Sequence, residues 1–187
     1  MPFINTDLPG LIIWEPRVLE DQRGYFYESY NRKTFKDAGL NYDFVQDNQA
    51  LSSRGVLRGL HYQLEPFGQA KLVSVISGEV LDVAVDIRQG SPTFGRHFSL
   101  VISAENRMRL MIPRGFAHGY LVLSDKAEFC YKCDNYYSRE HDAGIRFDDP
   151  GLGIDWQFDH KALILSEKDK ALPLMDEAKN NFKYLAG

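Results

Sequence analysis

Cysteine is scarce in this chain, and so are the features that mark several large classes of protein. Only two cysteines occur among 187 residues, too few for the disulfide framework of a small secreted domain. No apolar run approaches the roughly 18 residues needed to cross a bilayer. The first ten residues also lack the basic and apolar segments of a signal peptide. We therefore expect a cytoplasmic protein with no membrane partner.

An excess of basic residues is lacking as well. The chain has 22 lysines and arginines against 26 aspartates and glutamates, which gives a formal net charge of -4. A protein that binds nucleic acid through a broad basic surface has the opposite balance, so we expect no nucleic-acid partner. A small anionic ligand such as a diphosphate needs only a few local cations and remains compatible with this charge.

The two cysteines, Cys130 and Cys133, have the CxxC spacing that occurs in redox and zinc sites. Residues 128–133 have the composition of a strand, in which side chains three residues apart point to opposite faces. A redox CxxC usually opens a helix, and a structural zinc site needs further Cys or His ligands nearby. We therefore interpret both cysteines as small apolar strand residues.

Glycine-rich phosphate loops and a strand–helix alternation are absent, which argues against a dinucleotide-binding α/β fold. Short β-rich runs separated by turn signals occupy the middle of the chain instead. The predicted strands cover residues 71–76, 80–87, 96–102, 107–112, 116–123 and 127–131. This pitch is typical of an antiparallel sandwich or barrel. We predict one all-β domain over residues 1–187, with short peripheral helices.

Two marginal helices are predicted. The first begins after a cap at Asn31 and runs to Ala38, with Gly39 as its C-terminal stop. The second lies near residues 176–182 and gives the chain a helical tail.

Two of the five histidines, His61 and His118, lie in segments dense in polar groups and glycine. Each one, taken alone, is more often structural than catalytic. Arg58 precedes His61 by three residues, so on a regular strand the two side chains point to opposite faces unless a bulge at Gly59 re-aims one. Lys71 opens the next strand, where it is either a solvated strand end or a cation near an oxyanion.

Several blocks of sequence occur in the order seen in one known family. These blocks are residues 46–48, 55–63, 69–73, 82–88, 90–95, 112–119, 131–132, 149–150 and 165–169. Together they resemble the dTDP-4-dehydrorhamnose 3,5-epimerase family over about residues 10–174. The resemblance implies a cupin-like jelly roll, in agreement with the strand pattern. It also implies a homodimer in which N-terminal strands are exchanged between subunits.

The resemblance further implies a substrate and a set of catalytic residues. The family converts dTDP-4-dehydro-6-deoxy-D-glucose into dTDP-4-dehydro-L-rhamnose in dTDP-L-rhamnose biosynthesis. C3 and C5 both adjoin the C4 ketone, so loss of a proton from either carbon places negative charge on the same oxygen. Inversion requires acid–base groups on opposite faces of the ring. By resemblance, His61 is the base, Asp169 its partner, Tyr131 the opposite-face proton donor and Lys71 the cation that stabilises the enolate.

Substrate-binding residues follow from the same resemblance. Arg23 and Glu28 are expected to reach the nucleotide across the dimer, and Tyr137 to stack on the thymine. The remaining positions expected to contact the sugar or diphosphate are Gln46, Asp47, Asn48, Arg58, Lys71, His118 and Lys168. Asp142 occupies a position where the family is expected to have a substrate-binding glutamate. Its side chain is one methylene shorter, which leaves the nucleotide preference open.

No cofactor is expected, because no hydride moves in this reaction. A metal is not expected either, since cupin metal sites generally use a His-x-His pair, which the sequence lacks. Three alternatives stay open. One is an epimerase that inverts only C3 or only C5. Another is a cupin-like 3,4-ketoisomerase, which residues 58–63 and 168–169 fit less well. The third is a non-catalytic carbohydrate-binding jelly roll, which gives no reason for a base, its acidic partner and an opposing tyrosine.

Overall fold

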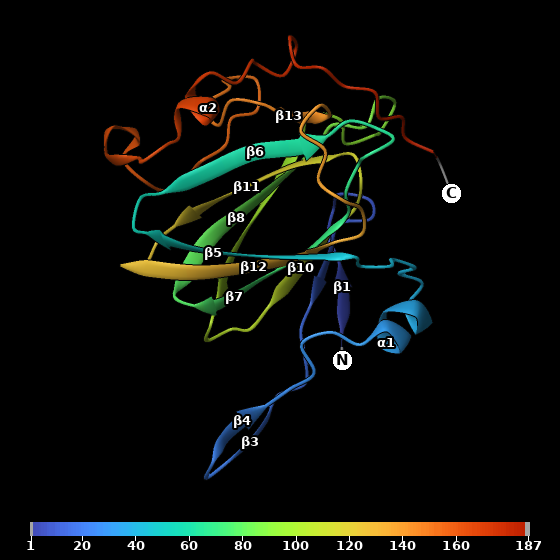
Figure 1. Ribbon diagram of the computed structural model, residues 1–187, viewed down its shortest axis with the longest axis vertical. Coiled ribbons are helices and arrows are strands. Elements are labelled where there is room, and N and C mark those ends of the chain that lie inside the picture. The colour runs from blue at the N-terminus through green and yellow to red at the C-terminus, as the bar shows by residue number, and fades with distance from the viewer. Residues whose placement is uncertain (1, 186–187) are drawn as a thin grey trace.

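Two antiparallel sheets face each other in the computed structural model, which describes residues 2–185 (Figure 1). The larger sheet contains β1 (Phe3–Asn5), β2 (Ile12–Trp14), β5 (Gln46–Ser53), β7 (Lys71–Ser77), β10 (Arg109–Ile112) and β12 (Lys126–Cys133). The smaller sheet contains β6 (Leu57–Gln63), β8 (Glu79–Asp86), β9 (His97–Ser103), β11 (Phe116–Val122) and β13 (Asp142–Gly144). The strand orders are β1-β2-β10-β7-β12-β5 and β13-β6-β11-β8-β9. The predicted all-β jelly-roll class is confirmed.

Residues that alternate along the strands fill the space between the sheets. On β12, Ala127 and Phe129 are buried, and Tyr131 packs against the same core cluster. Cys130 is half-buried, whereas Cys133 is fully buried. The predicted strand over the CxxC therefore forms and extends to Cys133.

The outer face of the smaller sheet is covered by the chain that follows β13. Trp156 and Phe182 from this segment are buried against Leu81 and Leu121 of the sheet, in a second core cluster. The indole nitrogen of Trp156 donates to the carbonyl of Phe147 at 2.8 Å. Strands β6, β8 and β11 are therefore buried on both faces, and the C-terminal segment is a third layer of the fold.

The first predicted helix is confirmed and the second is wrong. Helix α1 (Arg32–Asp37) starts after Asn31, whose side chain accepts hydrogen bonds from the backbone amides of Lys33 and Thr34. The segment 176–182 forms no helix, because its polar groups bond elsewhere. Asn180 donates to the carbonyl of Ile87 and also accepts from the backbone amide of Phe182.

Three smaller elements complete the described chain. A one-turn helix, α2 (Glu167–Lys170), begins after Ser166, and a 3-10 turn, η1, covers His160–Ala162. A hairpin of β3 (Leu19–Asp21) and β4 (Gly24–Phe26) projects away from the sandwich (Figure 1). No helix within residues 2–185 combines the length and apolar character needed to traverse a membrane.

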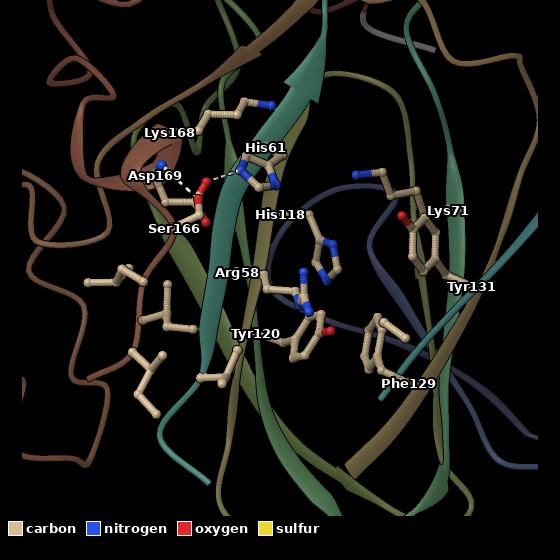
Figure 2. A pocket seen from close by; sticks show the side chains of 15 residues that line it. Arg58, His61, Lys71, His118, Tyr120, Phe129, Tyr131, Ser166, Lys168 and Asp169 are labelled. Carbon is tan, nitrogen blue, oxygen red and sulfur yellow. Dashed lines mark hydrogen bonds and ion pairs between the residues drawn. The ribbon is translucent and has the colours of Figure 1, made fainter. Parts of the chain in front are cut away.

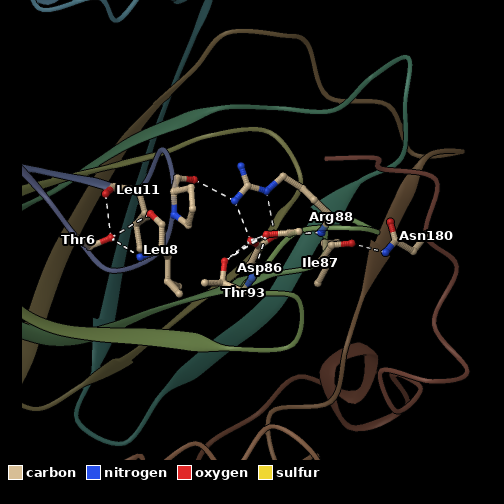
Figure 3. Close-up of polar contacts among 10 residues, drawn as sticks. Thr6, Leu8, Leu11, Asp86, Ile87, Arg88, Thr93 and Asn180 are labelled. Atoms are coloured by element: carbon tan, nitrogen blue, oxygen red, sulfur yellow. Dashed lines mark hydrogen bonds and ion pairs between the residues drawn. The ribbon is translucent and has the colours of Figure 1, made fainter. Parts of the chain in front are cut away.

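A buried carboxylate ties both ends of the chain to the turn after β8 (Figure 3). Asp86 is fully buried and accepts hydrogen bonds from Arg88, Ser91 and Thr93. Arg88 in turn donates to the carbonyl of Pro9 at 2.9 Å, and its guanidinium lies 5.0 Å from the ring centre of Tyr184. The N-terminal segment and the C-terminal tail therefore meet at one ion pair.

From the ion pair between Asp86 and Arg88 we predict that Asp86 makes a large and pH-dependent contribution to the free energy of unfolding. Burial alone raises the pKa of Asp86, but the hydrogen bonds from Arg88, Ser91 and Thr93 outweigh it, and the pKa is lowered. A lowered pKa in the folded state stabilises the protein above the unfolded value of about 3.9, and this contribution is lost as pH falls through the folded pKa. We expect Asp86→Ala to lower the free energy of unfolding by about 3 kcal/mol at neutral pH.

The control is Asp37→Ala, which removes an exposed pair with Lys33 and is expected to cost under about 0.5 kcal/mol. Urea denaturation at several pH values measures both variants. Equal losses in the two variants would contradict the assigned role of Asp86.

Candidate active site

A cavity of about 590 Å³ opens between the two sheets (Figure 2). Its lining residues come from β5, β6, β7, β11 and β12 and from the segment around α2. The titratable ones are Arg58, His61, Lys71, His118, Tyr120, Tyr131, Lys168 and Asp169. The cavity therefore gathers titratable residues that are up to 111 positions apart in sequence, between Arg58 and Asp169.

A bulge in β6 places Arg58 and His61 on the same wall. The neighbouring strand β11 pairs His118 with His61 but Tyr120 with Arg58, so β6 holds one extra residue between these pairs. Gly59 lies in this bulge, and its backbone has a φ of 135°. A Cβ atom on Gly59 would lie 2.5 Å from the Cα of Gly119. The sequence required a bulge at Gly59 for Arg58 and His61 to face the same side of the strand, and the structure has this bulge.

His61 forms a hydrogen bond with a buried carboxylate. Its Nε2 lies 2.6 Å from Oδ1 of Asp169, which is 3% exposed. Asp169 is held in turn by α2, where its backbone amide donates to the cap residue Ser166 at 3.1 Å. Burial raises the pKa of Asp169, but the contact with His61 and the hydrogen bond from Ser166 lower it overall. The carboxylate therefore accepts a hydrogen bond from Nε2–H, which leaves Nδ1 of His61 as the basic nitrogen.

The opposite wall carries a tyrosine and a lysine. Tyr131 extends from β12, and Nζ of Lys71 on β7 lies 5.9 Å from the centre of its ring. Burial raises the pKa of Tyr131 to about 12, so the phenol is protonated at neutral pH. Burial lowers the pKa of Lys71. Figure 2 shows His61 and Tyr131 facing each other across the cavity, with His118 between them.

Two further cations lie at the edge of the cavity. Arg58 donates to Oγ of Ser52 at 3.2 Å. Lys168 forms an ion pair with Asp142, and the hydroxyl of Tyr137 donates to the same carboxylate oxygen at 3.1 Å. These contacts connect Tyr137 and Asp142 to the cavity edge, although neither lines the cavity itself.

The other predicted binding residues lie outside the cavity. Asp47 forms an ion pair with Lys132, and Gln46 donates to Asn48 at 3.1 Å. Arg23 pairs with Asp21 in the projecting hairpin, and the carboxylate of Glu28 accepts a hydrogen bond from Asn31. One chain alone therefore does not bring Arg23 or Glu28 to the cavity.

Eight lining residues were not among the predicted site residues, and three of them, Tyr120, Phe129 and Ser166, carry aromatic or polar groups. Tyr120 and Phe129 stack with ring centres 4.0 Å apart. Tyr120 follows His118 by two residues and Phe129 precedes Tyr131 by two, so strand periodicity could have indicated them. Ser166 had no such signal. Within residues 2–185, no group of three or more His, Cys, Asp or Glu side chains has the arrangement of a metal site.

These features define a class: a jelly roll with an acid–base cavity that holds a histidine–carboxylate pair opposite a protonated tyrosine. The family model for dTDP-4-dehydrorhamnose 3,5-epimerase matches residues 5–177. The chain belongs to this family.

Individual relatives agree with this assignment. The dTDP-4-dehydrorhamnose 3,5-epimerase of Shigella flexneri is 52% identical over 170 residues, which cover 90% of this chain and 93% of the relative. A Legionella pneumophila epimerase solved with dTDP-4-keto-L-rhamnose is 47% identical, with a TM-score of 0.95 and 99% of each chain covered. A 3'-monoepimerase from Streptomyces bikiniensis, solved with dTDP-quinovose, is 35% identical with a TM-score of 0.87, and 92% of this chain and 87% of that chain are covered.

The bulge at Gly59 generates a prediction. Gly59→Ala introduces both a backbone clash with Gly119 and the strain of a positive φ. Overpacking and backbone strain together should lower the free energy of unfolding by about 3 kcal/mol or more and displace His61. Denaturant unfolding, together with a titration of His61 by NMR, measures both effects.

Gly90→Ala is the matched control, since Gly90 has a φ of 83° and nothing within 4 Å of a new Cβ. It should cost only the backbone strain, about 1 kcal/mol. If Gly59→Ala were as stable as this control, the close approach of Gly59 to Gly119 could not be the reason that glycine is needed in the bulge.

Proposed function

We propose that this protein inverts C3 and C5 of dTDP-4-dehydro-6-deoxy-D-glucose to give dTDP-4-dehydro-L-rhamnose, without a cofactor. The observation that carries the proposal is the placement of His61 and Tyr131 on opposite walls of one cavity. Inversion requires a proton to leave one face of the ring and another proton to arrive on the other face. The family to which the chain belongs supports the choice of substrate.

His61 acts as the base through Nδ1. Oδ1 of Asp169 accepts a hydrogen bond from Nε2, which lies 2.6 Å away, and stabilises the imidazolium that forms when Nδ1 takes a proton from C3 or C5. The electron pair moves to the C4 oxygen and gives an enolate. The ammonium of Lys71, half-buried on the opposite wall, stabilises this negative charge.

Tyr131 returns a proton from the opposite face. Its pKa of about 12 keeps the phenol protonated until the enolate carbon takes the proton. The phenolate that remains is close to Lys71, which lies on the same wall. Each inversion leaves His61 protonated and Tyr131 as a phenolate, so His61 then gives its proton to water and Tyr131 takes one from water. Because the ketone lies between C3 and C5, the restored arrangement of base, donor and cation serves both carbons.

The nucleotide binds at the edge of the cavity near α2. Arg58 and Lys168 supply cations for the diphosphate, and the half-exposed ring of Tyr137 stacks on the thymine. Asp142 accepts from Lys168 and Tyr137. We infer that this aspartate orients these two binding groups despite its short side chain.

A second copy of the chain completes the site. The projecting hairpin leaves Phe26 68% exposed, and the outer face of the larger sheet exposes Leu51 and Ile76. A partner that packs against the hairpin and this face of the sheet would remove these apolar side chains from water. In a homodimer with exchanged N-terminal strands, Arg23 and Glu28 reach the nucleotide of the partner. We place this dimer in the cytoplasm.

The alternative is inversion of a single carbon, as in a 3'-monoepimerase, and deuterium incorporation distinguishes the two. The protein is incubated with the 4-keto sugar nucleotide in heavy water and the sugar is observed by NMR. We expect deuterium at both C3 and C5. Incorporation at one carbon selects a mono-epimerase, and incorporation at neither rejects the proposed function.

Two variants test the assigned roles. His61→Ala should slow exchange at both carbons by roughly 10²- to 10⁴-fold, because no other group takes the proton. Tyr131→Phe should retain exchange by the base but block completed inversion.

His97→Ala and Tyr62→Phe are the matched controls. His97 lies on β9 away from the cavity, and Tyr62 is a second buried tyrosine whose pKa is about 12. Both should leave exchange and inversion unchanged. Normal inversion by Tyr131→Phe would remove this residue from the mechanism.

A further inference from the structure

The projecting hairpin of β3 and β4 is held by an arginine of the sandwich. The two strands pair Glu20 with Tyr25 and Leu19 with Phe26. The guanidinium of Arg107, in the turn between β9 and β10, lies 4.2 Å from the ring centre of Tyr25. Its Nη1 also lies 3.2 Å from Oε1 of Glu20. Arg107 therefore contacts both members of one cross-strand pair.

The other cross-strand pair lies on the opposite face of the hairpin. Neighbouring residues of a strand point to opposite faces, so Leu19 and Phe26 point away from the face that Arg107 contacts. These two side chains are exposed, whereas that of Arg107 is only 20% exposed. One face of the hairpin is thus fixed to its own chain, and the apolar face is uncovered within residues 2–185.

A second arginine extends the contact toward the base of the hairpin. Arg109 on β10 is buried, and its guanidinium lies 5.8 Å from the ring centres of Tyr27 and Trp14. The rings of Tyr25 and Tyr27 stack with their centres 5.9 Å apart. A guanidinium over an aromatic face is attracted to the ring. Arg107, Arg109 and the two tyrosines therefore form a continuous stack from the sandwich into the hairpin.

The backbone around Arg107 is fixed as well. Oδ1 of Asn106 accepts hydrogen bonds from the backbone amides of Ser103 and Met108. The amide group of the same side chain donates to the carbonyl of Val101 at 2.9 Å. Arg107 has a φ of 53°, a conformation that residues other than glycine seldom adopt. The turn therefore fixes the direction in which the side chain of Arg107 leaves the backbone.

The hairpin carries residues that the proposed function needs. Arg23 lies at its tip, between β3 and β4, with a side chain that is 90% exposed. Glu28 follows the end of β4 by two residues. Neither residue reaches the cavity of its own chain. Their position relative to a second copy depends on the angle at which the hairpin leaves the sandwich, and the contacts of Arg107 set that angle.

We propose that Arg107 is a positioning residue for the nucleotide site of the partner subunit. It holds the hairpin so that Arg23 and Glu28 reach a nucleoside diphosphate bound by the other chain. This inference rests on the proposed function and adds to it a residue that does not line the cavity. Without Arg107 the hairpin would have to be ordered when the nucleotide binds, while His61 and Tyr131 stay in place. The effect should therefore fall on KM and not on kcat.

Backbone relaxation tests the holding role without any substrate. The variant is Arg107→Asn, because asparagine tolerates a positive φ and keeps the turn while the contacts to the hairpin are lost. We expect the ¹⁵N order parameters of the amides of Arg23 and Gly24 to fall, with little change in the free energy of unfolding. Order parameters equal to those of the unaltered protein would overturn the inference.

The matched control is Arg96→Asn. Arg96 forms an exposed ion pair with Asp7, outside the hairpin, so the same substitution there removes a surface cation without touching Tyr25 or Glu20. The order parameters at the tip of the hairpin and the affinity for dTDP should both stay unchanged in this control. A loss equal to that of Arg107→Asn would show that general surface charge, and not the hairpin contact, is responsible.

Calorimetry with dTDP tests the link to the nucleotide. Arg107→Asn should weaken dTDP binding roughly tenfold, because the hairpin must then be ordered on binding. Arg107→Lys keeps a cation near the ring and should recover part of the affinity. In turnover, Arg107→Asn should raise KM by a similar factor and leave kcat nearly unchanged. Unchanged affinity, or a fall in kcat alone, would contradict the positioning role.

Mixed dimers decide which cavity Arg107 serves. Two chains with different affinity tags are combined, and one carries His61→Ala so that only the cavity of the other chain reacts. With Arg107→Asn on the His61→Ala chain, the reacting cavity receives the altered hairpin, and KM should rise roughly tenfold. With Arg107→Asn on the reacting chain, KM should match that of the unaltered protein. Equal KM values in the two arrangements, or a protein that is monomeric in solution, would reject a role across the dimer.

The experiments separate this inference from the proposed function. A purely structural Arg107 would lower the free energy of unfolding and give the two mixed dimers the same KM. Absence of deuterium exchange in the unaltered protein would reject the proposed function, while the relaxation and dTDP-binding results would still decide the role of Arg107.

Discussion

The catalytic wall depends on one close approach between two backbones. At Gly59 and Gly119 the strands β6 and β11 come so near that a Cβ on Gly119 would lie 2.8 Å from the carbonyl oxygen of Arg58. This space allows the bulge in β6, and the bulge turns Arg58 and His61 toward the same cavity. Without it, the two-residue period of a strand would direct one of them to the outer face of the sheet. Arg58 and His61 therefore face the same cavity because neither Gly59 nor Gly119 has a side chain.

Much of the fold could be predicted from local sequence. Strands show an alternation of apolar and polar residues, and turns are marked by glycine, proline and asparagine. The strand predicted over residues 80–87 is observed as Glu79–Asp86, and the cap at Asn31 starts a helix as expected. The roles of the site residues could be predicted from local sequence only in part. The segments around His61 and His118 indicated polar sites, but the roles of Asp169, Tyr131 and Lys71 came from the resemblance to a family.

What the sequence missed is held by contacts between distant residues. The helix expected over 176–182 does not form, because Asn180 bonds to a carbonyl in the turn after β8, 93 positions away. Asp82 was not singled out, since nothing near it in sequence shows that it meets His118 on the adjacent strand. Arg23 and Glu28 lie outside the cavity of their own chain, so their predicted role depends on a second copy that one sequence does not describe.

The carboxylate partner of His61 follows all the described strands in the sequence. Every strand has been completed by Gly144, yet the carboxylate that holds His61 belongs to Asp169 on a single helical turn beyond it. The segment beyond Gly144 also covers the outer face of the smaller sheet, where Trp156 and Phe182 are buried. Loss of the residues that follow Gly144 would therefore remove one layer of the core and the carboxylate partner of His61 together, so the stability of the sheet and the state of the imidazole depend on one segment.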